Sequence, residues 1–564
     1  MRDLTLYLPG TKKELEIRGW NEVDVILFSG DAYIDHPQSG AAVIGRVLEA
    51  AGYRVALVPQ PDWRGDHRDF LKLGAPRLFF AVTGGAMDSM VNHYTAAKRL
   101  RSDDAFTPDG RAGRRPDRCT EVYTHILKQH FPKVPVVIGG IEASMRRLIH
   151  YDYWTDRLRE SILVTSGADL LIYGMGEQAI VDIARAIEAT GQVPHDVPQT
   201  AYMVDHVDEE RLGNTKRLYG WEDVLHDKRK HAENFRTIEI ESNKVQSELT
   251  LLQDKVVVNP PYAPITPEEL DRIYDLPFQY QPHPKYDGHR IPAYEMIRFS
   301  VCMHRGCFGG CSFCTISAHQ GKQIVSRSKD SILRQIKRIS ELPDYKGYIS
   351  DLGGPSANMY KMEGKDRTIC VRCAKASCLQ PKICPNLKVD FQPVLDIYQT
   401  VDKLPYVKKA FVGSGIRYDL MNEDYARQLI TRHVSGRLKV APEHTEDRVV
   451  ELMRKPHWST YLRFMALFEK INREAGLNQQ LIPYFISSHP GCTNDDMRAL
   501  AEWTKKMHYH PEQVQDFTPT PMTLSTTMFY TGYNPYTMEK VYVARTAEQK
   551  KKQNSYFFWW RHGH

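Results

Sequence analysis

Short apolar runs recur along the first 180 residues and alternate with segments long enough to form helices. The runs lie at 25–28, 55–58, 78–82, 134–138 and 169–173, and a helix is expected over 40–51. Such alternation is typical of a doubly wound parallel sheet, which binds ligands at the carboxyl ends of its strands. Turns of small residues follow four strands, at 29–31, 83–85, 139–142 and 174–177. We therefore predict an N-terminal α/β domain over residues 1–204, with these turns as the lips of a ligand cleft.

The alternation stops between residues 205 and 290, where a charged segment and several prolines predict a helical and extended connector. It resumes in a second α/β domain over 291–526, and an aromatic and basic extension follows at 527–564. Strands of the second domain are expected at 298–302, 348–352, 410–412, 438–440, 481–486 and 514–517. A helix is expected over 328–342, because one helical face would carry Ile332, Leu333, Ile336 and Ile339.

Length and charge set the broad class of the protein. A chain of 564 residues predicts roughly three domains, at about 100–200 residues each. The 75 basic and 69 acidic residues leave a formal charge of +6 with no long tail of one sign, so nucleic acid is a permitted partner but is not indicated. The start of the chain has no apolar signal region and no run approaches about 18 apolar residues, so we expect a cytoplasmic protein without a membrane partner.

Cysteines are concentrated in one part of the chain. Eight of the ten lie between positions 302 and 384, which indicates metal binding in a reducing compartment. Three of them, Cys307, Cys311 and Cys314, follow the 298–302 strand in a glycine-rich loop with C-x3-C-x2-C spacing. Because close-spaced thiolates hold iron–sulfur clusters, we predict that they bind a [4Fe–4S] cluster and leave one iron open for chemistry. The alternatives are a three-cysteine zinc site, although structural zinc normally has a fourth protein ligand, and chance clustering.

This motif resembles the signature of the radical S-adenosylmethionine (SAM) superfamily, and the whole chain resembles its YgiQ family, of the UPF0313 type. The resemblance implies a partial (β/α)6 TIM barrel for residues 291–526, with a [4Fe–4S] cluster and SAM as cofactors. In such enzymes the reduced cluster cleaves SAM to a 5′-deoxyadenosyl radical, which abstracts hydrogen from a substrate. An electron donor such as flavodoxin or ferredoxin is then expected. The substrate is not revealed by the sequence.

The resemblance also indicates which turns bind SAM. Gly353 and Gly354 stand where the superfamily carries a Gly-Gly-Glu turn, but Pro355 replaces the acid, so binding of the SAM amino group would rest on backbone carbonyls. Ser414 and Arg417 are then candidates for the SAM carboxylate or ribose, and Glu443 and His444 for ribose or substrate. An ordinary hydrogen-bonded pair on the surface is the alternative for Glu443 and His444. No catalytic side chain is assigned.

A second cysteine group lies in an insertion over 365–390, and comprises Cys370, Cys373, Cys378 and Cys384. Four thiols are enough to close a tetrahedral zinc site or to ligate an auxiliary iron–sulfur cluster, and the spacing does not choose between them. Four reduced thiols without a metal are the least expected of the three alternatives, because cysteines at this density have few other uses.

The N-terminal domain is Rossmann-like and resembles the cobalamin-binding domain that precedes the barrel in many radical SAM enzymes. That domain carries Asp-x-His-x-x-Gly, whereas Asp35 and His36 are adjacent here, so the acid cannot orient the imidazole in the same way. We therefore expect no tightly bound cobalamin, and a domain that closes over the barrel mouth. The insertion at 99–118 is expected to be a surface loop, with phosphate contact by its arginines as the alternative.

A rival function is an RNA- or ribosome-associated binding protein, in which the cluster is structural or senses redox state. The C-terminal extension, with its aromatic residues and the lysines 550–552, is the segment that suggests it. Packing of these aromatic residues on the barrel is the favoured interpretation, since no RNA-binding motif is present.

Overall fold

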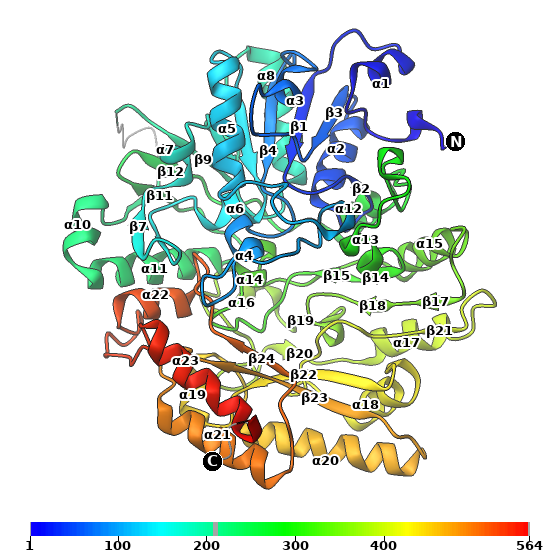
Figure 1. The fold of residues 1–564 in the computed structure, drawn as a ribbon, viewed down its shortest axis with the longest axis vertical. Helices are drawn as coiled ribbons and strands as arrows, with labels where there is room; N and C mark the ends of the chain where they lie inside the picture. The colour runs from blue at the N-terminus through cyan, green and yellow to red at the C-terminus, as the bar shows by residue number, and fades with distance from the viewer. Residues whose placement is uncertain (1, 207–212, 562–564) are drawn as a thin grey trace. The chain divides into compact units, whose positions relative to one another are not determined.

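The structure is a computed structural model of the 564-residue chain, and it describes residues 2–206 and 213–561. The chain forms two compact units (Figure 1), neither of which is continuous in sequence. The N-terminal unit comprises residues 1–226, 246–263 and 268–298. The C-terminal unit comprises residues 227–245, 264–267 and 299–564.

A nine-stranded sheet, in the order β10-β11-β12-β9-β8-β5-β4-β1-β3, organises the N-terminal unit. Its parallel part consists of β1 (Val25–Ser29), β3 (Val55–Pro59), β4 (Phe79–Thr83), β5 (Val136–Gly139) and β8 (Leu170–Ile172). These are the five strands predicted from the apolar runs, and the predicted helix is α2 (Gly40–Ala50). Every residue of β1 and of β3 is buried, as expected for a parallel sheet covered on both faces. The doubly wound α/β class is therefore confirmed for this unit.

Helices cover this parallel part of the sheet. The longest are α5 (Cys119–His130) and α8 (Glu177–Thr190), and both lie against the strands in Figure 1. Helix α8 packs on α2, and α5 packs on β4 and β5. The shorter α4 (Ser89–His93) and α6 (Gly140–Met145) begin in the turns after β4 and β5. The carboxyl ends of neighbouring strands therefore carry short helices and turns at one edge of the sheet.

The stretch 205–290, expected to be a connector, is instead largely part of the two units. It contributes the strands β10 (Thr215–Arg217), β11 (Thr250–Gln253) and β12 (Val256–Val258), which extend the sheet beyond β9 (Thr200–Met203). Their short stretches lie among charged residues and prolines and outside the strand–helix alternation, which is why only the polar and proline-rich segments were recognised. The same stretch also holds α12 (Pro267–Tyr274).

Helix α11 (Lys228–Ser242), within the expected connector, belongs to the C-terminal unit. It packs on α22 (Leu524–Thr531), and Phe235 forms a small buried cluster with Leu524 and Met528. Its polar sequence is explained by this arrangement, because only one stripe of the helix meets a partner.

Parallel strands followed by helices recur along the C-terminal unit. The strands are β14 (Ser300–Cys302), β17 (Tyr348–Ile349), β18 (Asp351–Gly353), β21 (Lys409–Ala410), β22 (Arg437–Glu443), β23 (Gln480–Ser487) and β24 (Gln513–Asp516). The pairs β14–β18, β17–β21, β22–β23 and β23–β24 are all parallel. The helices between them include α15 (Lys329–Ser340), α17 (Gln392–Val401), α20 (Trp458–Glu474) and α21 (Asn494–Lys506). Each of the six predicted strand positions is occupied by a strand.

Helix α15 shows how the apolar pattern translates into packing. Ser328 caps its N-terminus by accepting a hydrogen bond from the Ser331 amide. Ile332, Ile336 and Ile339 are fully buried on one face, as their spacing predicted. Burying a side chain of this kind contributes about 1.5–3 kcal/mol to the stability of the fold.

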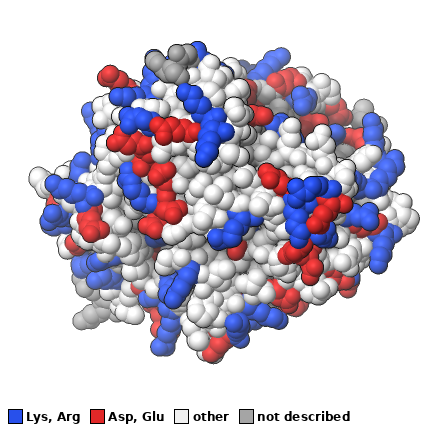
Figure 2. All heavy atoms as spheres, turned by 90° about the horizontal axis from the view of Figure 1, so that it is seen from below, with Lys and Arg blue, Asp and Glu red and all other residues white. Residues whose placement is uncertain are grey.

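The end of the chain packs on the C-terminal unit through its aromatic residues. Helix α23 (Ala547–Ser555) leads into η6 (Tyr556–Arg561), whose Phe557 is fully buried and whose Trp559 donates a hydrogen bond to Thr504. On the face shown in Figure 2, basic and acidic side chains alternate without a large patch of one sign among the described residues. Within the described part of the chain, no helix combines the length and apolar character needed to cross a membrane.

Candidate functional site

The cysteine loop of the C-terminal unit turns tightly because two of its glycines are sterically required. Gly306 has a φ of +84°, and a Cβ there would lie 1.9 Å from the Gln323 carbonyl oxygen. Gly310 has a φ of +62°, and a Cβ there would lie 2.2 Å from the Ala376 carbonyl oxygen. Neither position accepts a side chain.

The three thiols in this loop act on one another electrostatically. Burial raises the pKa of Cys307 and raises that of Cys314 to about 12, and the neighbouring Cys311 adds to both effects. Such a set of soft sulfur donors fits a metal cluster, since a bound metal deprotonates and stabilises the thiolates. Within residues 2–206 and 213–561, no three His, Cys, Asp or Glu side chains are already arranged as a metal site. The assignment of these ligands therefore stays a prediction.

Arg417 reaches the same loop from the turn after β21. Its Nη1 lies 3.4 Å from Cys311 Sγ, while Nε and Nη2 donate to the Asp419 carboxylate at 2.8 and 2.6 Å. Burial would lower the pKa of this guanidinium, but Asp419 outweighs the burial and raises it. The candidate SAM ligand Arg417 is therefore a charged group directed at the cysteines.

A second buried ion pair also lies near the loop. Glu443 ends β22 with a φ of +71°, an unfavourable conformation for a residue with a side chain, and its carboxylate lies 3.5 Å from Lys455 Nζ. Burial raises the pKa of Glu443, while Lys455 and then Arg417 lower it. Lys455 also acts electrostatically on Cys307 and Cys314. The sequence analysis missed Lys455, because nothing in its local sequence indicates that it folds back toward the cysteines.

The predicted SAM turn is braced by an acid that the sequence analysis also missed. Asp351, two residues before Gly353, accepts hydrogen bonds from the amides of Gly413 and Ser414 at 2.8 and 3.0 Å and from the Ser414 hydroxyl. Burial raises the pKa of Asp351. A Cβ on Gly353 would lie 2.5 Å from Ser414 Oγ, so the two candidate turns are in contact. The available signal was a carboxylate in the predicted strand, just before the glycine turn.

His304 lies directly on the other glycine of this turn. A Cβ on Gly354 would lie 2.5–3.0 Å from three atoms of the His304 ring. The imidazole is fully buried, neither of its nitrogens has a hydrogen-bond partner, and burial lowers its pKa to about 4. A neutral imidazole with a free donor and a free acceptor therefore lines the position where SAM is expected. It precedes the cysteine motif by three residues, and no sequence pattern singled it out.

His444 is separated chemically from its neighbour Glu443. Its Nδ1 accepts a hydrogen bond from the Glu446 amide, and its Nε2 lies 3.6 Å from Cys492 Sγ. Burial lowers the pKa of His444 to about 4. Both ring nitrogens thus have partners other than Glu443, and the two residues are not a hydrogen-bonded surface pair; the ribose or substrate role of each stays a prediction.

The second cysteine group packs directly on the first. The Cys378 amide donates to the Phe308 carbonyl at 3.0 Å, and Ser377 Oγ donates to the Gly309 carbonyl at 2.7 Å. Cys370, Cys373 and Cys384 all act electrostatically on Cys378, whose pKa burial raises to about 11. Lys322 Nζ donates to the Cys373 carbonyl at 3.2 Å and lies 3.7 Å from its sulfur.

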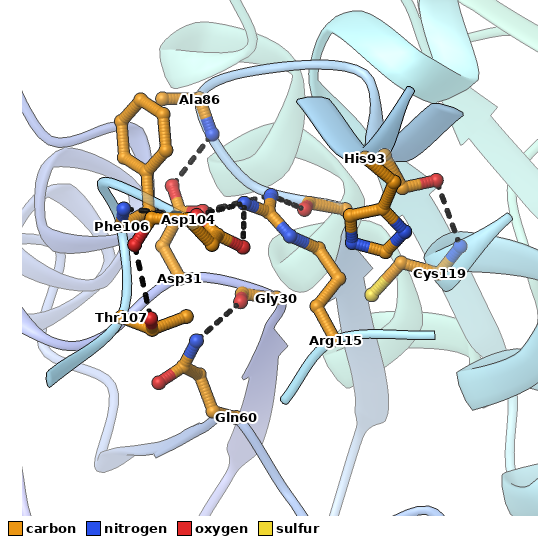
Figure 3. Close-up of polar contacts among 12 residues, drawn as sticks. Gly30, Asp31, Gln60, Ala86, His93, Asp104, Phe106, Thr107, Arg115 and Cys119 are labelled. Carbon is orange, nitrogen blue, oxygen red and sulfur yellow. Dashed lines mark hydrogen bonds and ion pairs between the residues drawn. The ribbon is translucent and has the colours of Figure 1, made fainter. Parts of the chain in front are cut away.

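The predicted ligand cleft of the N-terminal unit is filled by the protein itself (Figure 3). Arg115, from the insertion that was expected to be a surface loop, is almost fully buried between the turns after β1 and β4. Its Nη1 donates to Asp31 and to the Gly84 carbonyl at 3.0 and 2.8 Å, and its Nη2 donates to Asp104 at 3.0 Å. The surface-loop prediction is therefore wrong for Arg115, because buried carboxylates hold its charge inside.

Asp35 and His36, the residues compared with the cobalamin motif, are both buried in the N-terminal unit. Asp35 is fully buried and pairs with Arg46, so it does not orient His36. His36 is fully buried against Tyr280, and burial lowers its pKa to about 3. The expectation that cobalamin is not tightly bound therefore stays a prediction.

Comparison with known proteins identifies the family. Residues 7–300 match the radical SAM N-terminal family, residues 301–504 the radical SAM superfamily, and residues 512–563 a domain of unknown function, DUF3362. A UPF0313 protein of Bacteroides thetaiotaomicron is 58% identical over 99% of this chain and 94% of its own length. The chain belongs to the UPF0313 family. It is a radical SAM enzyme, and the match leaves its substrate open.

Relatives extend beyond that organism. UPF0313 proteins of Porphyromonas gingivalis and Methanocella arvoryzae are 57% and 48% identical, over 99% and 96% of this chain and 91% of each relative. A radical SAM methyltransferase, TsrM, from Kitasatospora setae, solved with cobalamin and a [4Fe–4S] cluster, has a TM-score of 0.50 at 13% identity. That likeness covers 89% of this chain and 74% of TsrM, and shows a shared fold. Both the family and the fold class predicted from sequence are confirmed.

Proposed function

We propose that this UPF0313 protein binds a [4Fe–4S] cluster through Cys307, Cys311 and Cys314, and binds SAM beside it. The observation that carries the proposal is the glycine-cradled loop, whose three thiols influence one another and lie next to Arg417 and Lys455. When bound and reduced, the cluster supplies the electron that cleaves SAM to methionine and a 5′-deoxyadenosyl radical, which abstracts hydrogen from the substrate. The substrate class is left open.

The chain's own residues bind and orient the cofactors in this proposal. Gly353 and Gly354 present backbone polar groups to SAM, and Asp351 fixes that turn against Ser414. The buried pairs of Arg417 with Asp419 and of Lys455 with Glu443 keep charged groups beside the cysteine loop without water. Interactions fixed in advance in a dry site cost no reorganisation when charge moves there. The partial (β/α)6 barrel is the arrangement that we propose for the parallel strands of this unit.

Further cofactors and partners follow from the same chemistry. We propose that Cys370, Cys373, Cys378 and Cys384 hold zinc or an auxiliary iron–sulfur cluster, and that tight cobalamin binding does not occur. A low-potential electron donor such as flavodoxin or ferredoxin would reduce the cluster. None of the ten cysteines, all of which lie in the described part of the chain, forms a disulfide, which suits a reducing cytoplasm. RNA binding is not proposed, because the aromatic residues of the tail that suggested it pack on the C-terminal unit.

The proposal is tested by anaerobic reconstitution with iron and sulfide. The wild type is expected to show thiolate-to-iron absorbance at roughly 400 nm and to release 5′-deoxyadenosine from SAM under dithionite. Cys307→Ala should lose both signals, while the matched thiol substitution Cys119→Ala, in the other unit, should keep them. Full cluster content and SAM cleavage in Cys307→Ala would show that the ligands are elsewhere.

A further inference from the structure

Arg417 contacts the cysteine loop in a way that the proposed cofactor chemistry does not itself require. Three of its five N–H groups have fixed partners, two on the Asp419 carboxylate and one on the sulfur of Cys311. The guanidinium also covers the loop backbone, since a Cβ on Gly309 would lie 3.1 Å from Arg417 Nη1 and 3.4 Å from Cys307 Sγ. Arg417 therefore contacts Cys311 directly and acts electrostatically on Cys307 as well.

The backbone of Arg417 is held as firmly as its side chain. Asn358, which is fully buried, accepts a hydrogen bond from the Arg417 amide at 2.9 Å and donates to the Arg417 carbonyl at 2.8 Å. With Asp419 gripping the guanidinium, little of its conformational freedom remains. A donor that is fixed in this way is already oriented toward the sulfur before any cofactor binds.

Hydrogen bonds to the sulfurs and the net charge around an iron–sulfur cluster set its reduction potential. Reduction adds one electron, so the reduced cluster is the more negative form. A buried N–H donor carrying a positive charge favours that form over the oxidised one. Water does not screen the effect, because Arg417 is only 6% exposed.

We propose that Arg417 is a positioning residue that raises the reduction potential of the cluster through its hydrogen bond to Cys311 Sγ. The inference rests on the proposed function, because it requires a cluster on Cys307, Cys311 and Cys314. It gives Arg417 a role different from the SAM carboxylate or ribose contact expected from sequence. Asp419 then serves to keep the guanidinium aimed at the sulfur.

The test is a redox titration of the reconstituted full-length protein, followed by electron paramagnetic resonance. In Arg417→Gln the reduced-to-oxidised ratio at a fixed potential should fall at least tenfold, a midpoint shift of about 59 mV toward negative values for one electron. Arg417→Lys keeps a charged donor and should recover part of the shift. The control is Arg427→Gln, which removes a half-exposed arginine that pairs with Glu423 and Glu474 and should leave the midpoint unchanged.

The outcomes separate this inference from the function on which it rests. If the wild type assembles no cluster, the proposed function fails and the inference fails with it. If Arg417→Gln carries wild-type iron with an unchanged midpoint, only the role of Arg417 is overturned. Loss of the cluster from both Arg417 variants, with unchanged far-UV circular dichroism, would assign Arg417 to cluster assembly and would also overturn the inference. A similar shift in Arg427→Gln would mean that overall charge, and not the contact with sulfur, sets the potential.

Discussion

At the scale of single residues, buried charge is concentrated where ligands would otherwise bind. In the N-terminal unit, Arg115 is flanked by Asp31 and Asp104, and Asp31 also accepts a hydrogen bond from the Ala86 amide. Removing one partner of such a buried group leaves an uncompensated charge and typically costs about 3–5 kcal/mol. The cleft is thus closed by interactions that also stabilise the fold.

Asp31 gives this cluster a defined pH dependence. Burial raises its pKa to about 6 against the opposing effect of Arg115, so the folded protein holds this proton more tightly than the unfolded chain. Its contribution to stability is therefore fully present below about pH 4 and is lost as the pH rises through about 6. Between about pH 4.5 and 7 the free energy of unfolding, measured with urea, should fall less for Asp31→Asn than for the wild type. The difference between the two losses should be about 1–3 kcal/mol.

The exposed Asp103 supplies the control for this titration. Asp103→Asn removes a carboxyl group next to Asp104 but outside the buried cluster, and should follow the wild-type pH profile. An Asp31→Asn profile that coincides with the wild type would show that Asp31 is not the titrating group.

At the scale of elements, the sequence predicted those helices and strands that have a clear local pattern of apolar residues. Apolar runs in the sequence predicted five strands of the parallel sheet, namely β1, β3, β4, β5 and β8. A helical stripe of isoleucines predicted α15. The strands β10, β11 and β12 lie outside the strand–helix alternation, and their place in the sheet is set by pairing, with β10 beside β11 and β12 beside β9.

The candidate site could be predicted only as far as its motif extends. The spacing of Cys307, Cys311 and Cys314 is visible in the sequence, as are the glycines of the 353–354 turn. Lys455 and His304 reach the site through contacts with residues far away in the sequence. The local sequence around each of them does not indicate those contacts. Arg417 was a candidate for SAM binding, and that role stays a prediction; its contact with Cys311 depends on a side-chain direction that sequence does not encode.

The Cys-rich insertion is an element whose metal is separately testable. Cys370→Ser combined with Cys373→Ser should remove a distinct portion of bound zinc or iron, measured by mass spectrometry, while SAM cleavage stays detectable. We expect SAM cleavage to be retained in part because Ser377 and Cys378 make hydrogen bonds between the insertion and the first cysteine loop, and the variant keeps both residues. Unchanged total metal would mean that the insertion holds none, and complete loss of cleavage would mean that the two cysteine groups act as one site.

At the scale of the whole molecule, the two units are interleaved along the chain. The chain contributes α11 to the C-terminal unit and then returns to supply β11 and β12 to the N-terminal sheet. Besides Phe235 in the cluster with Leu524 and Met528, α11 is anchored by the ion pair of Glu239 with Arg454. Removal of the residues before about 260 would therefore also remove α11 from the C-terminal unit.

The cluster on α11 provides the corresponding prediction. Phe235→Ala in the full-length protein should lower the free energy of unfolding of the C-terminal unit by about 3–5 kcal/mol, because a buried aromatic ring is replaced by a cavity. Hydrogen exchange should then rise in α22 and not in β1 or β3. The control is Leu225→Ala, an exposed residue just before α11, for which we expect a change of about 0.5 kcal/mol or less. Equal exchange in α22 of Phe235→Ala and wild type would show that α11 does not support that unit.

The docking of α11 also has a consequence for protein synthesis. Phe235 and its partner Leu524 are separated by 289 residues, the difference between their positions. At about 5–20 residues per second, a ribosome needs roughly 15–60 s to pass from one to the other. Throughout that interval α11 has emerged with its apolar stripe facing water, while the strands made after it already complete the sheet of the first unit. The nascent chain therefore carries α11 without its C-terminal partner for about half of its synthesis.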